Sequence, residues 1–401
     1  MPGPMEGVRV VELGFWVAGP SAAAILADWG AEVIKIEPLR GDPFRQLFSQ
    51  AAGLESSFNP PFELDNRGKR SIAINYAEAE GLDIALQIID RADVFITNLR
   101  PGALVRAGLD YESLAQRNPR LVYASVTGYG LDGLDRDRAA FDIGAFWSRS
   151  GIAASLSPAG TAPPYQRPGM GDHVAGIAAA AGVCAALVAR NRTGRGQMIS
   201  TSLLRLGIFA LGWDMNIMLR MGMTALPMTR EFTPNPMTSC YYDRDGRWFW
   251  LLGLQGDRVW PGLARAVGHP EWLEDERFSN LLARGVNCAE LVGLLDEIFP
   301  TRPLAEWAEI LDREGVWWAP VLTTDQVVDD PQAIACGAFV DVPVPEGSPR
   351  MVASPVDFSE GGSQPRSVPE LGQHTEEILL ELGYDREVIS RLKEKGAIPS
   401  S

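Results

Sequence analysis

The chain has 401 residues, with 36 Lys and Arg against 51 Asp and Glu, so its formal net charge is −15 with its three His neutral. An acidic surface of this kind disfavours a nucleic-acid groove, because phosphate backbones are bound by basic faces. Hydrophobic residues make up 46% and charged residues 22% of the chain, which is typical of a folded globular protein and excludes a disordered one. The length predicts two domains, or one large and one small.

Cysteines and apolar segments indicate where the protein resides. The four cysteines lie far apart and form no CxxC pair, so we expect reduced thiols and neither a zinc site nor a disulfide scaffold. Residues 1–7 lack the basic and apolar regions of a secretory signal. The longest apolar run, residues 174–189, is shorter than the ~20 residues that cross a bilayer, and its Ala and Gly residues predict a buried helix. We therefore expect a cytoplasmic protein without a membrane segment.

Strands and helices alternate along the first part of the chain. Residues 8–13 and 31–37 have the pattern of strands, and residues 21–29 between them predict a helix that Pro20 helps to begin. The same alternation continues with a helix at 78–91, a strand at 92–97, a helix at 111–117 and a strand at 121–126. This order predicts an α/β fold with a parallel sheet, right-handed crossovers and a ligand site where the strands end.

The pattern changes after Gly196. Residues 200–222 predict one long apolar helix, and residues 227–236 an extended linker with three prolines. A second unit is then expected, with strands from about residue 240, helices near 257–268 and 287–299, a return to the first domain from 319, and a last helix near 373–396. The predicted boundaries are 1–222 for the N-terminal part of the large domain, 223–239 for the linker, 240–318 for the small α+β domain and 319–401 for the return.

A dinucleotide site is suggested by Glu37, which ends the second predicted strand where a ribose-binding acid often lies. The turn after the first strand, residues 14–20, lacks the GxGxxG spacing and ends in a proline, which has no amide proton. NAD binding is therefore disfavoured. No HExxH, GxSxG or P-loop pattern occurs, so metal and serine-hydrolase chemistry are not supported either.

Asp172 follows a glycine-rich turn and precedes the long apolar helix. The structural interpretation of such an aspartate is a helix N-cap. The functional interpretation uses the same position, because the helix dipole favours an ionised carboxylate and the glycines leave room for a substrate, which would make Asp172 a nucleophile. His173 is expected to be structural, since neighbouring residues on a helix point to different sides.

Basic residues recur after successive predicted strands. On an acidic protein most of them are expected to be solvated surface charges. Their recurrence nevertheless favours a polyanion site for some of them, because arginine suits phosphate geometry. They are Lys35, Arg40, Arg67, Lys69, Arg70, Arg100, Arg106, Arg136 and Arg138.

Nine blocks of sequence together resemble the family III CoA-transferases, also called the CaiB/BaiF family. They follow the family's order from the N-terminus to residue 375. The blocks are Gly7–Leu13, Ala18–Pro20, Gly30–Glu37, Asn66–Ser71, Arg100–Gly102, Gly128–Gly130, Gly171–Asp172, Thr193–Gln197 and Leu371–Thr375.

The resemblance implies a homodimer of two ring-like subunits threaded through each other. Each subunit would have a large Rossmann-like domain formed by both chain ends and a small middle domain. Asp172 would be the nucleophile that carries CoA, with Asp142 and Gly171 in support, no metal, and coenzyme A or acyl-CoA as a substrate rather than a permanently bound cofactor. The positions that match the family's CoA-binding residues are Val17, Ala18, Arg40, Ile74, Asn98, Leu99, Arg106 and Arg138.

Two positions depart from the family's pattern. Phe141 stands where the racemase branch has an acid/base histidine, and because a phenyl ring exchanges no proton, racemisation at Cα is disfavoured. Residues 232–236 stand where formyl-CoA transferases carry a glycine-rich loop, which places oxalate-type substrates in doubt.

The leading hypothesis is transfer of CoA from an acyl-CoA donor to a free carboxylic acid through an aspartyl-CoA thioester on Asp172. Amides of residues 169–171 are candidates for stabilising the oxyanions, and Asp142 for orienting the nucleophile or tuning its pKa. Two alternatives remain open: an acyl-CoA racemase or isomerase of the same family, and a nucleotide-binding oxidoreductase or non-catalytic CoA-binding module.

The expected partners are a second copy of the chain, an acyl-CoA and a carboxylic acid, with no nucleic acid and no membrane. Five aromatic residues near the motifs suggest a bulky or apolar acyl group, although large hydrophobic residues are more often part of a core. They are Phe15, Trp16, Phe146, Trp147 and Trp213.

Overall fold

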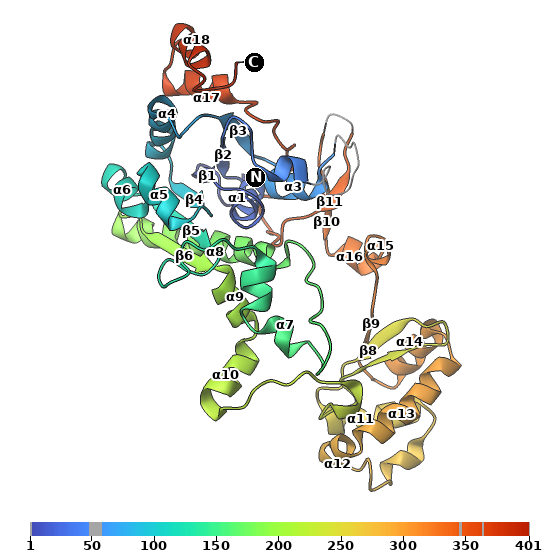
Figure 1. The fold of residues 1–401 in the computed structure, drawn as a ribbon. Coiled ribbons are helices and arrows are strands. Elements are labelled where there is room, and N and C mark those ends of the chain that lie inside the picture. The colour runs from blue at the N-terminus through green and yellow to red at the C-terminus, as the bar shows by residue number, and fades with distance from the viewer. Residues whose placement is uncertain (1, 48–57, 345–346, 363–364, 401) are drawn as a thin grey trace. The chain divides into compact units, whose positions relative to one another are not determined.

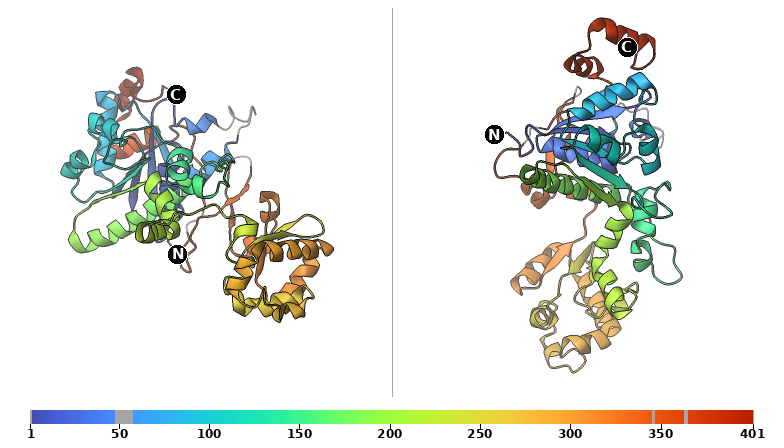
Figure 2. Two further views of the ribbon diagram at one scale, coloured as in Figure 1. Left: turned by 60° about the horizontal axis from the view of Figure 1, so that its bottom comes forward. Right: turned by 90° about the vertical axis from the view of Figure 1, so that its left-hand side faces the viewer.

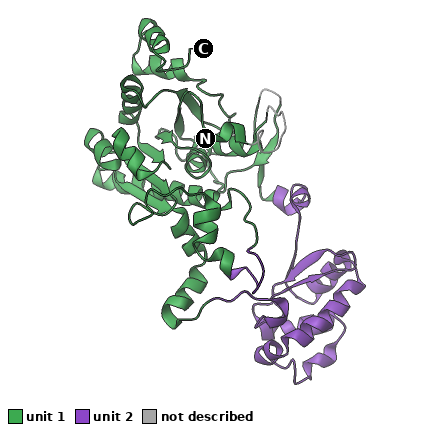
Figure 3. Ribbon diagram, viewed as in Figure 1, with its two compact units in different colours: residues 1–154, 164–224, 335–401 green, residues 155–163, 225–334 purple. Residues whose placement is uncertain are grey.

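The computed structural model describes residues 2–47, 58–344, 347–362 and 365–400, and the chain divides into two compact units (Figures 1 and 3). The first unit comprises residues 1–154, 164–224 and 335–401, and the second comprises residues 155–163 and 225–334.

The first unit is built on a six-stranded sheet in the order β3-β2-β1-β4-β5-β6. All five strand pairings are parallel, so the predicted α/β fold with a parallel sheet is confirmed. The chain order reverses between β1 and β4, which is the place where open α/β sheets bind ligands at the carboxyl ends of their strands. The strands are β1 (Arg9–Leu13), β2 (Glu32–Glu37), β3 (Arg70–Ala73), β4 (Val94–Thr97), β5 (Val122–Thr127) and β6 (Met198–Ser202).

Helices cover both faces of this sheet (Figures 1 and 2). Successive strand side chains point to opposite faces, and Val10 and Val11 accordingly belong to two different hydrophobic clusters. The cluster around Val10 includes α1 (Ala18–Asp28) and α8 (Met170–Thr193). The cluster around Val11 includes α4 (Ala79–Asp90), α17 (Thr375–Leu382) and α18 (Arg386–Glu394).

The predicted apolar helix at 174–189 is the central part of α8, which runs for 24 residues. Small residues let α1 and α8 approach each other closely, since a Cβ on Gly176 would come within 1.8 Å of the Ser21 hydroxyl oxygen. By length and composition alone α8 would also be able to span a membrane, but it packs along α1, β5 and β6 in the first hydrophobic cluster.

Two predicted helices are wrong because each is interrupted. The segment 200–222 contains the end of β6, and then α9 (Leu203–Ala210) and α10 (Gly212–Met221); Ser202 ends the strand and caps α9 by accepting a hydrogen bond from the Arg205 amide. The segment 373–396 divides into α17 and α18 because Gly383, with a φ of +97°, ends the first helix.

Shorter elements complete the first unit. They are α3 (Pro60–Asn66), α5 (Pro101–Ala107), α6 (Tyr111–Arg117), the π-helix η1 (Ile143–Ser148), α7 (Ile152–Ser155), β10 (Phe339–Asp341) and β11 (Arg350–Val352).

The second unit contains an antiparallel sheet in the order β7-β8-β9, covered by helices. Its strand β9 pairs with β8, and residues 319–334 therefore lie in the second unit instead of returning to the first at residue 319. The domain layout implied by the family resemblance stays a prediction. The elements are η2 (Arg230–Phe232), β7 (Cys240–Tyr242), β8 (Trp248–Leu251), α11 (Gly256–Ala266), η3 (Pro270–Leu273), α12 (Leu281–Val286), α13 (Cys288–Ile298), η4 (Phe299–Thr301), α14 (Leu304–Arg313), β9 (Trp318–Pro320), α15 (Thr324–Val327) and α16 (Pro331–Ala335).

Candidate active site

A cavity of about 710 Å³ lies at the start of α8, and all of its lining residues belong to the first unit. Four of these residues are titratable: Asp65, Asp142, Asp172 and His173. The others are apolar residues and one glycine, from the loop after β1, the segment around residue 44, α3 and the loops before η1 and α8. The volume is in the range of small-molecule sites, and the lining combines an apolar wall with a few convergent polar groups, as such sites do.

Asp172 lies in the first turn of α8, and it does not cap the helix. The N-cap residue is Gly169, whose φ of +78° is one that residues with a side chain rarely adopt. The interpretation of Asp172 as the N-cap is therefore wrong. A second glycine is required next to the aspartate, because a Cβ on Gly171 would come within 2.5 Å of the Phe146 ring. The two glycines thus form the tight turn that brings Asp172 to the cavity.

Asp142 connects the start of α8 to η1. Its Oδ2 accepts hydrogen bonds from the Gly171 amide at 3.2 Å and from the Gln166 side-chain amide at 2.9 Å, and its Oδ1 accepts from the Ile143 amide at 2.8 Å. The residue is 6% exposed. The Gly171 amide, which the sequence offered as an oxyanion donor, is therefore used by Asp142 in this structure.

The electrostatics of the cavity act on Asp172. Burial, together with the negative charge of Asp142, raises the pKa of Asp172 from 3.8 to about 7, although His173 opposes the shift. A carboxyl group of this kind changes its charge near neutral pH. Strong pKa shifts produced by burial and a specific charged neighbour are characteristic of functional groups.

His173 has a carboxylate partner that sequence analysis did not identify. Its Nε2 lies 3.2 Å from Oδ1 of Asp65 on α3, and Asp65 is only 2% exposed. Burial works against the charged imidazole, but the hydrogen bond and charge of Asp65 and the charges of Asp172 and Asp142 raise the pKa of His173 above its ordinary value. Asp65 is 108 positions away in the chain, and no spacing motif relates the two residues.

Buried ion pairs lie behind this cavity and bond the backbone of residues that line it. The Nζ of Lys35 lies 2.7 Å from Glu12 and 3.0 Å from Asp42, and the Nζ of Lys69 lies 2.5 Å from the other oxygen of Glu12, with all four side chains inaccessible to water. Arg67 similarly pairs with Asp28 at 2.6 Å. Neither expectation holds for Lys35, Lys69 and Arg67, which are not solvated surface charges and are not available to a polyanion, because internal carboxylates neutralise them.

Trp16 carries the strained backbone of the site. Its φ of +66° is the only positive φ of a non-glycine residue in the described part of the chain. Its ring lies edge-on to Phe141 at 5.6 Å and packs on Phe44 at 6.2 Å. Among the five aromatic residues expected near an acyl group, Trp16 lines the cavity, whereas Phe146 is core and Trp213 is 83% exposed.

The residues predicted to bind CoA follow the carboxyl ends of successive strands. Val17 and Ala18 come after β1, Arg40 after β2, Ile74 after β3, and Asn98 and Leu99 after β4, so the parallel sheet brings them to one edge. Arg106 lies in the last turn of α5, and Arg138 precedes η1.

Their side chains differ in availability. Arg40, Arg106 and Arg138 are exposed, whereas Ile74 is buried and presents only its backbone. The Asn98 side chain holds the loop after β1, accepting from the Phe15 amide at 2.9 Å and donating to the Phe15 carbonyl at 2.7 Å. The CoA-binding roles of these residues stay predictions.

Glu37, the acidic residue that suggested a dinucleotide site, is not accessible to a ligand in this structure. Glu37 is fully buried, and its carboxylate accepts hydrogen bonds from Ser71 Oγ at 2.7 Å, from the Arg45 guanidinium and from the Asp42 amide. A ribose has no access to it. In the described ranges, no group of three His, Cys, Asp or Glu side chains is arranged to hold a metal ion.

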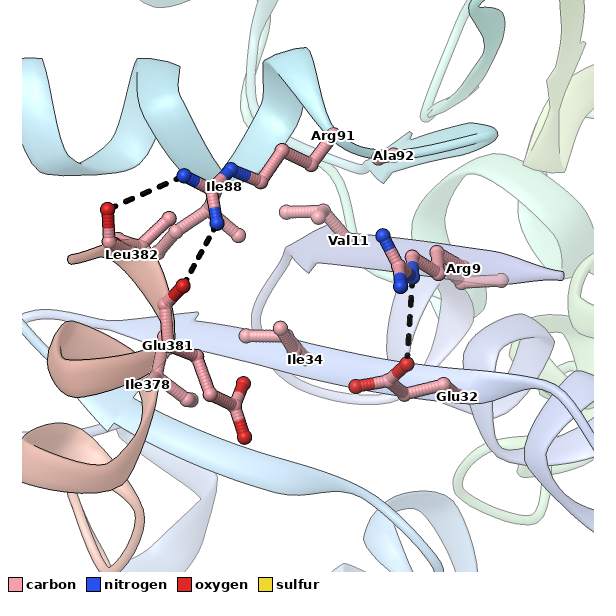
Figure 4. Close-up of a pocket in the computed structure, with 11 residues that line it drawn as sticks. Arg9, Val11, Glu32, Ile34, Ile88, Arg91, Ala92, Ile378, Glu381 and Leu382 are labelled. Atoms are coloured by element: carbon pink, nitrogen blue, oxygen red, sulfur yellow. Dashed lines mark hydrogen bonds and ion pairs between the residues drawn. The ribbon is translucent and has the colours of Figure 1, made fainter. Parts of the chain in front are cut away.

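A second cavity, of about 310 Å³, lies at the opposite edge of the sheet, where β1 and β2 begin (Figure 4). Its charged groups are already paired: Arg9 lies 3.6 Å from Glu32, and Arg91 donates to the carbonyl oxygens of Glu381 and Leu382. Among the described residues that line it there is no Ser, Cys or His. Its two carboxylates, Glu32 and Glu381, are both held in ion pairs with arginines.

Comparisons with known proteins identify the family of the chain. The family described as CoA-transferase family III matches residues 5–375. The chain is 34% identical over 399 residues to (R)-2-hydroxy-4-methylpentanoate CoA-transferase of Clostridioides difficile, covering 98% of this chain and 99% of that protein. It is 34% identical over 398 residues to cinnamoyl-CoA:phenyllactate CoA-transferase of Clostridium sporogenes, covering 97% and 95%. A solved structure of a CaiB/BaiF family protein from Brucella suis matches with a TM-score of 0.83 at 31% identity, covering 95% of this chain and 100% of that one.

Asp172→Asn should make the protein more stable than the wild type at about pH 8. The folded state raises the pKa of Asp172 from 3.8 to about 7, so the ionised carboxylate destabilises the fold, increasingly as the pH rises between these two values. One pKa unit corresponds to about 1.4 kcal/mol, so the rise from 3.8 to about 7 predicts a gain in unfolding free energy on the order of 4 kcal/mol above pH 7, which vanishes near pH 4. Chemical denaturation across this pH range measures it.

Glu360→Gln serves as the control, because Glu360 is exposed and lies outside the cavity lining. Its stability difference from the wild type should stay near zero at every pH. A difference between Asp172→Asn and the wild type that does not change with pH would show that Asp172 is not the titrating group.

Proposed function

The chain belongs to CoA-transferase family III, and from this we propose that Asp172 is the nucleophile on which it carries CoA from one carboxylic acid to another. The chain is thus an enzyme of the family III CoA-transferase type. One observation supports the specific role of Asp172: this carboxylate faces a cavity of substrate size at the first turn of α8, with its pKa raised to about 7.

In the proposed reaction the ionised Asp172 attacks the carbonyl carbon of an acyl-CoA thioester. The C–S bond breaks, leaving an acyl-aspartyl anhydride and CoA thiolate. The thiolate then attacks the aspartyl carbonyl, the donor acid leaves as a carboxylate, and an aspartyl-CoA thioester remains. The acceptor carboxylate reverses these steps, so that no proton or electron is gained overall and the thioester energy is retained.

Burial suits Asp172 to this task. A carboxylate in water is a weak nucleophile because it is strongly hydrated, and its basicity rises when the surroundings remove that hydration. The negative charge of Asp142 adds to the effect. The Asp142 side chain also holds the Gly171 amide, so it positions the turn from which Asp172 projects.

The phosphates of CoA need cations outside this cavity, since neither lysine nor arginine is among the described residues that line it. Arg40, Arg106 and Arg138 are exposed and follow the carboxyl edge of the sheet, and we assign the phosphates to them. Arginine forms charge-assisted, bidentate hydrogen bonds with phosphate oxygens.

A homodimer is part of this proposal. Phe209, Trp213 and Leu219 on α9 and α10 are 82%, 83% and 79% exposed, and α10 buries none of its residues in the described chain. Met170 and Ile177 on α8 are also exposed. Monomeric proteins rarely leave such apolar patches in water, and a second copy would cover them. The four free cysteines suit the reducing cytoplasm, which we propose as the protein's location.

Trapping the intermediate tests the nucleophile. Incubation with an acyl-CoA followed by hydroxylamine should convert the Asp172 side chain to a hydroxamate that peptide mass spectrometry locates. Asp142→Asn should retain the adduct, whereas Asp172→Asn should lose it while still binding CoA. An adduct on another residue, or none with any of several donors, contradicts the assignment. Deuterium uptake at Cα of the acyl group in heavy water would favour a racemase instead.

The pH dependence of turnover provides a second prediction. Since Asp172 attacks as a carboxylate, kcat/KM should rise with pH along a limb whose apparent pKa is about 7. Asp142→Asn removes a like charge and should move this limb to lower pH. Glu360→Gln should leave it in place. A limb that does not move in Asp142→Asn would show that Asp142 does not act on the titrating group.

The dimer is tested by sedimentation over a dilution series. Obligate interfaces bury more than ~2,000 Å² and are largely apolar, so we expect a dimer down to nanomolar concentration. Trp213→Glu, which places a charge on the exposed face of α10, should weaken it. A folded monomer of the wild type on simple dilution would contradict the assembly.

A further inference from the structure

We propose that the acids handled at Asp172 are monocarboxylates with a bulky apolar side chain, that His173 binds their carboxylate, and that Trp16 selects their side chain. This inference rests on the proposed function of Asp172. It adds the class of acid, the group that holds it, and the exclusion of acids that carry a second carboxylate.

The wall of the cavity determines what side chain it can accept. Ten of its fourteen lining residues are apolar or glycine. Trp16, Phe44 and Phe141 form a continuous aromatic surface, in which the ring centroid of Phe44 lies 6.2 Å and that of Phe141 5.6 Å from the Trp16 ring. Phe141 is 56% exposed, which places a large apolar area in contact with solvent until a ligand covers it. Each methylene group buried there should improve binding about fourfold.

The charges of the cavity exclude a second carboxylate. The four titratable lining residues are three aspartates and one histidine, and neither arginine nor lysine occurs among the described residues that line the cavity. A dicarboxylate would place one of its charges against the aromatic wall or beside an aspartate. An unpaired charge in such surroundings is strongly disfavoured.

The single basic group of the lining is suited to the carboxylate that reacts. Nε2 of His173 is held by Asp65, which fixes the ring and leaves Nδ1 on its other side. That side is the one that faces Gly169, since a Cβ built on Gly169 would lie 3.6 Å from Nδ1, and Gly169 itself lines the cavity. Asp65, Asp172 and Asp142 all favour the protonated ring, the form in which both nitrogens carry a proton. The Nδ1–H can then donate to an acid beside Asp172.

Trp16 is held in place against its own backbone preference. The left-handed region disfavours a bulky residue, and strain of this type concentrates at functional sites. The Trp16 amide donates to Asp42 at 3.2 Å, and Asp42 is fixed by the buried Lys35. The structure therefore maintains a costly conformation whose visible result is an indole ring on the wall of the cavity.

The first experiment compares acceptor acids with one acyl-CoA donor, 3-phenylpropanoyl-CoA. We expect kcat/KM for 4-methylpentanoate and hexanoate to exceed that for succinate and glutarate by at least about a hundredfold, the effect of an unpaired buried charge. Hydroxylamine trapping at Asp172 is run with the same donors. Trapping together with a preference for dicarboxylates would overturn this inference and leave the proposed function intact, whereas no trapping with any donor would overturn both.

Variants separate the two residues. Trp16→Leu should lower the preference for 4-phenylbutanoate over hexanoate by about tenfold, and Trp317→Leu, an exposed tryptophan of the second unit, is its control. His173→Gln should raise KM for every acceptor acid at least tenfold and leave the affinity for CoA, measured by calorimetry, nearly unchanged. Equal losses in both measurements would indicate a structural role for His173 and overturn its part of the inference.

A gain of function completes the test. Leu64 on α3 lines the cavity next to Asp65. Leu64→Arg would supply a cation to pair with the second carboxylate of a dicarboxylate. This variant should raise the kcat/KM ratio of glutarate to hexanoate by at least tenfold. Circular dichroism and CoA binding by calorimetry confirm that the variant is folded. A folded, CoA-binding Leu64→Arg enzyme with an unchanged ratio would contradict the exclusion by charge.

Discussion

Glu12 is bound by two lysines that water does not reach, and the geometry of the cavity depends on these contacts. Its two oxygens lie 2.7 Å from Lys35 and 2.5 Å from Lys69, and Asp42 completes a cluster of two cations and two anions. Buried charges are tolerated only when they are paired and hydrogen-bonded, and removing one partner typically costs about 3 to 5 kcal/mol. Lys69 is the less compensated of the two lysines, since burial lowers its pKa to about 8. The two positive and two negative charges of the cluster cancel, and a substitution that neutralises any one of the four residues would leave a buried charge without a partner.

Both sides of the cavity are attached to this cluster. Asp42 accepts from the Trp16 and Phe44 amides, which positions the aromatic wall. Lys69 donates to the Asp65 carbonyl at 2.6 Å, which positions the carboxylate that holds His173. Strain in one residue and the orientation of another are thus maintained by charges that take no part in the chemistry. This division explains why the region needs four charged residues in strands and loops that are otherwise apolar.

The sequence predicted the sheet well and the cavity only in part. Strands such as β1 and β2 are rich in Val and Ile and lie between turns, whereas β6 was missed because its Ser and Thr residues precede an apolar helix without a break. Asp172 was found through the Gly171–Asp172 motif. The contact between its neighbour His173 and Asp65 was not found, since these two residues are 108 positions apart in the chain. Lys35 was taken for a surface charge although a signal was present. A lysine in the middle of a strand that is buried on both faces needs a partner, and Glu12 is its register neighbour on β1.

The charges of the site also impose an order on the reaction. The first attack requires an ionised Asp172, and while Asp172 is ionised its negative charge opposes the entry of a free carboxylate into the same cavity. Forming the aspartyl-CoA thioester converts Asp172 to a neutral carbonyl and removes this charge. The acceptor carboxylate then replaces it beside His173, and the charge balance of the cavity is the same as before the reaction began. The acceptor acid would therefore bind only after the donor has reacted, because the charge of Asp172 excludes the acceptor carboxylate until Asp172 has become part of the thioester.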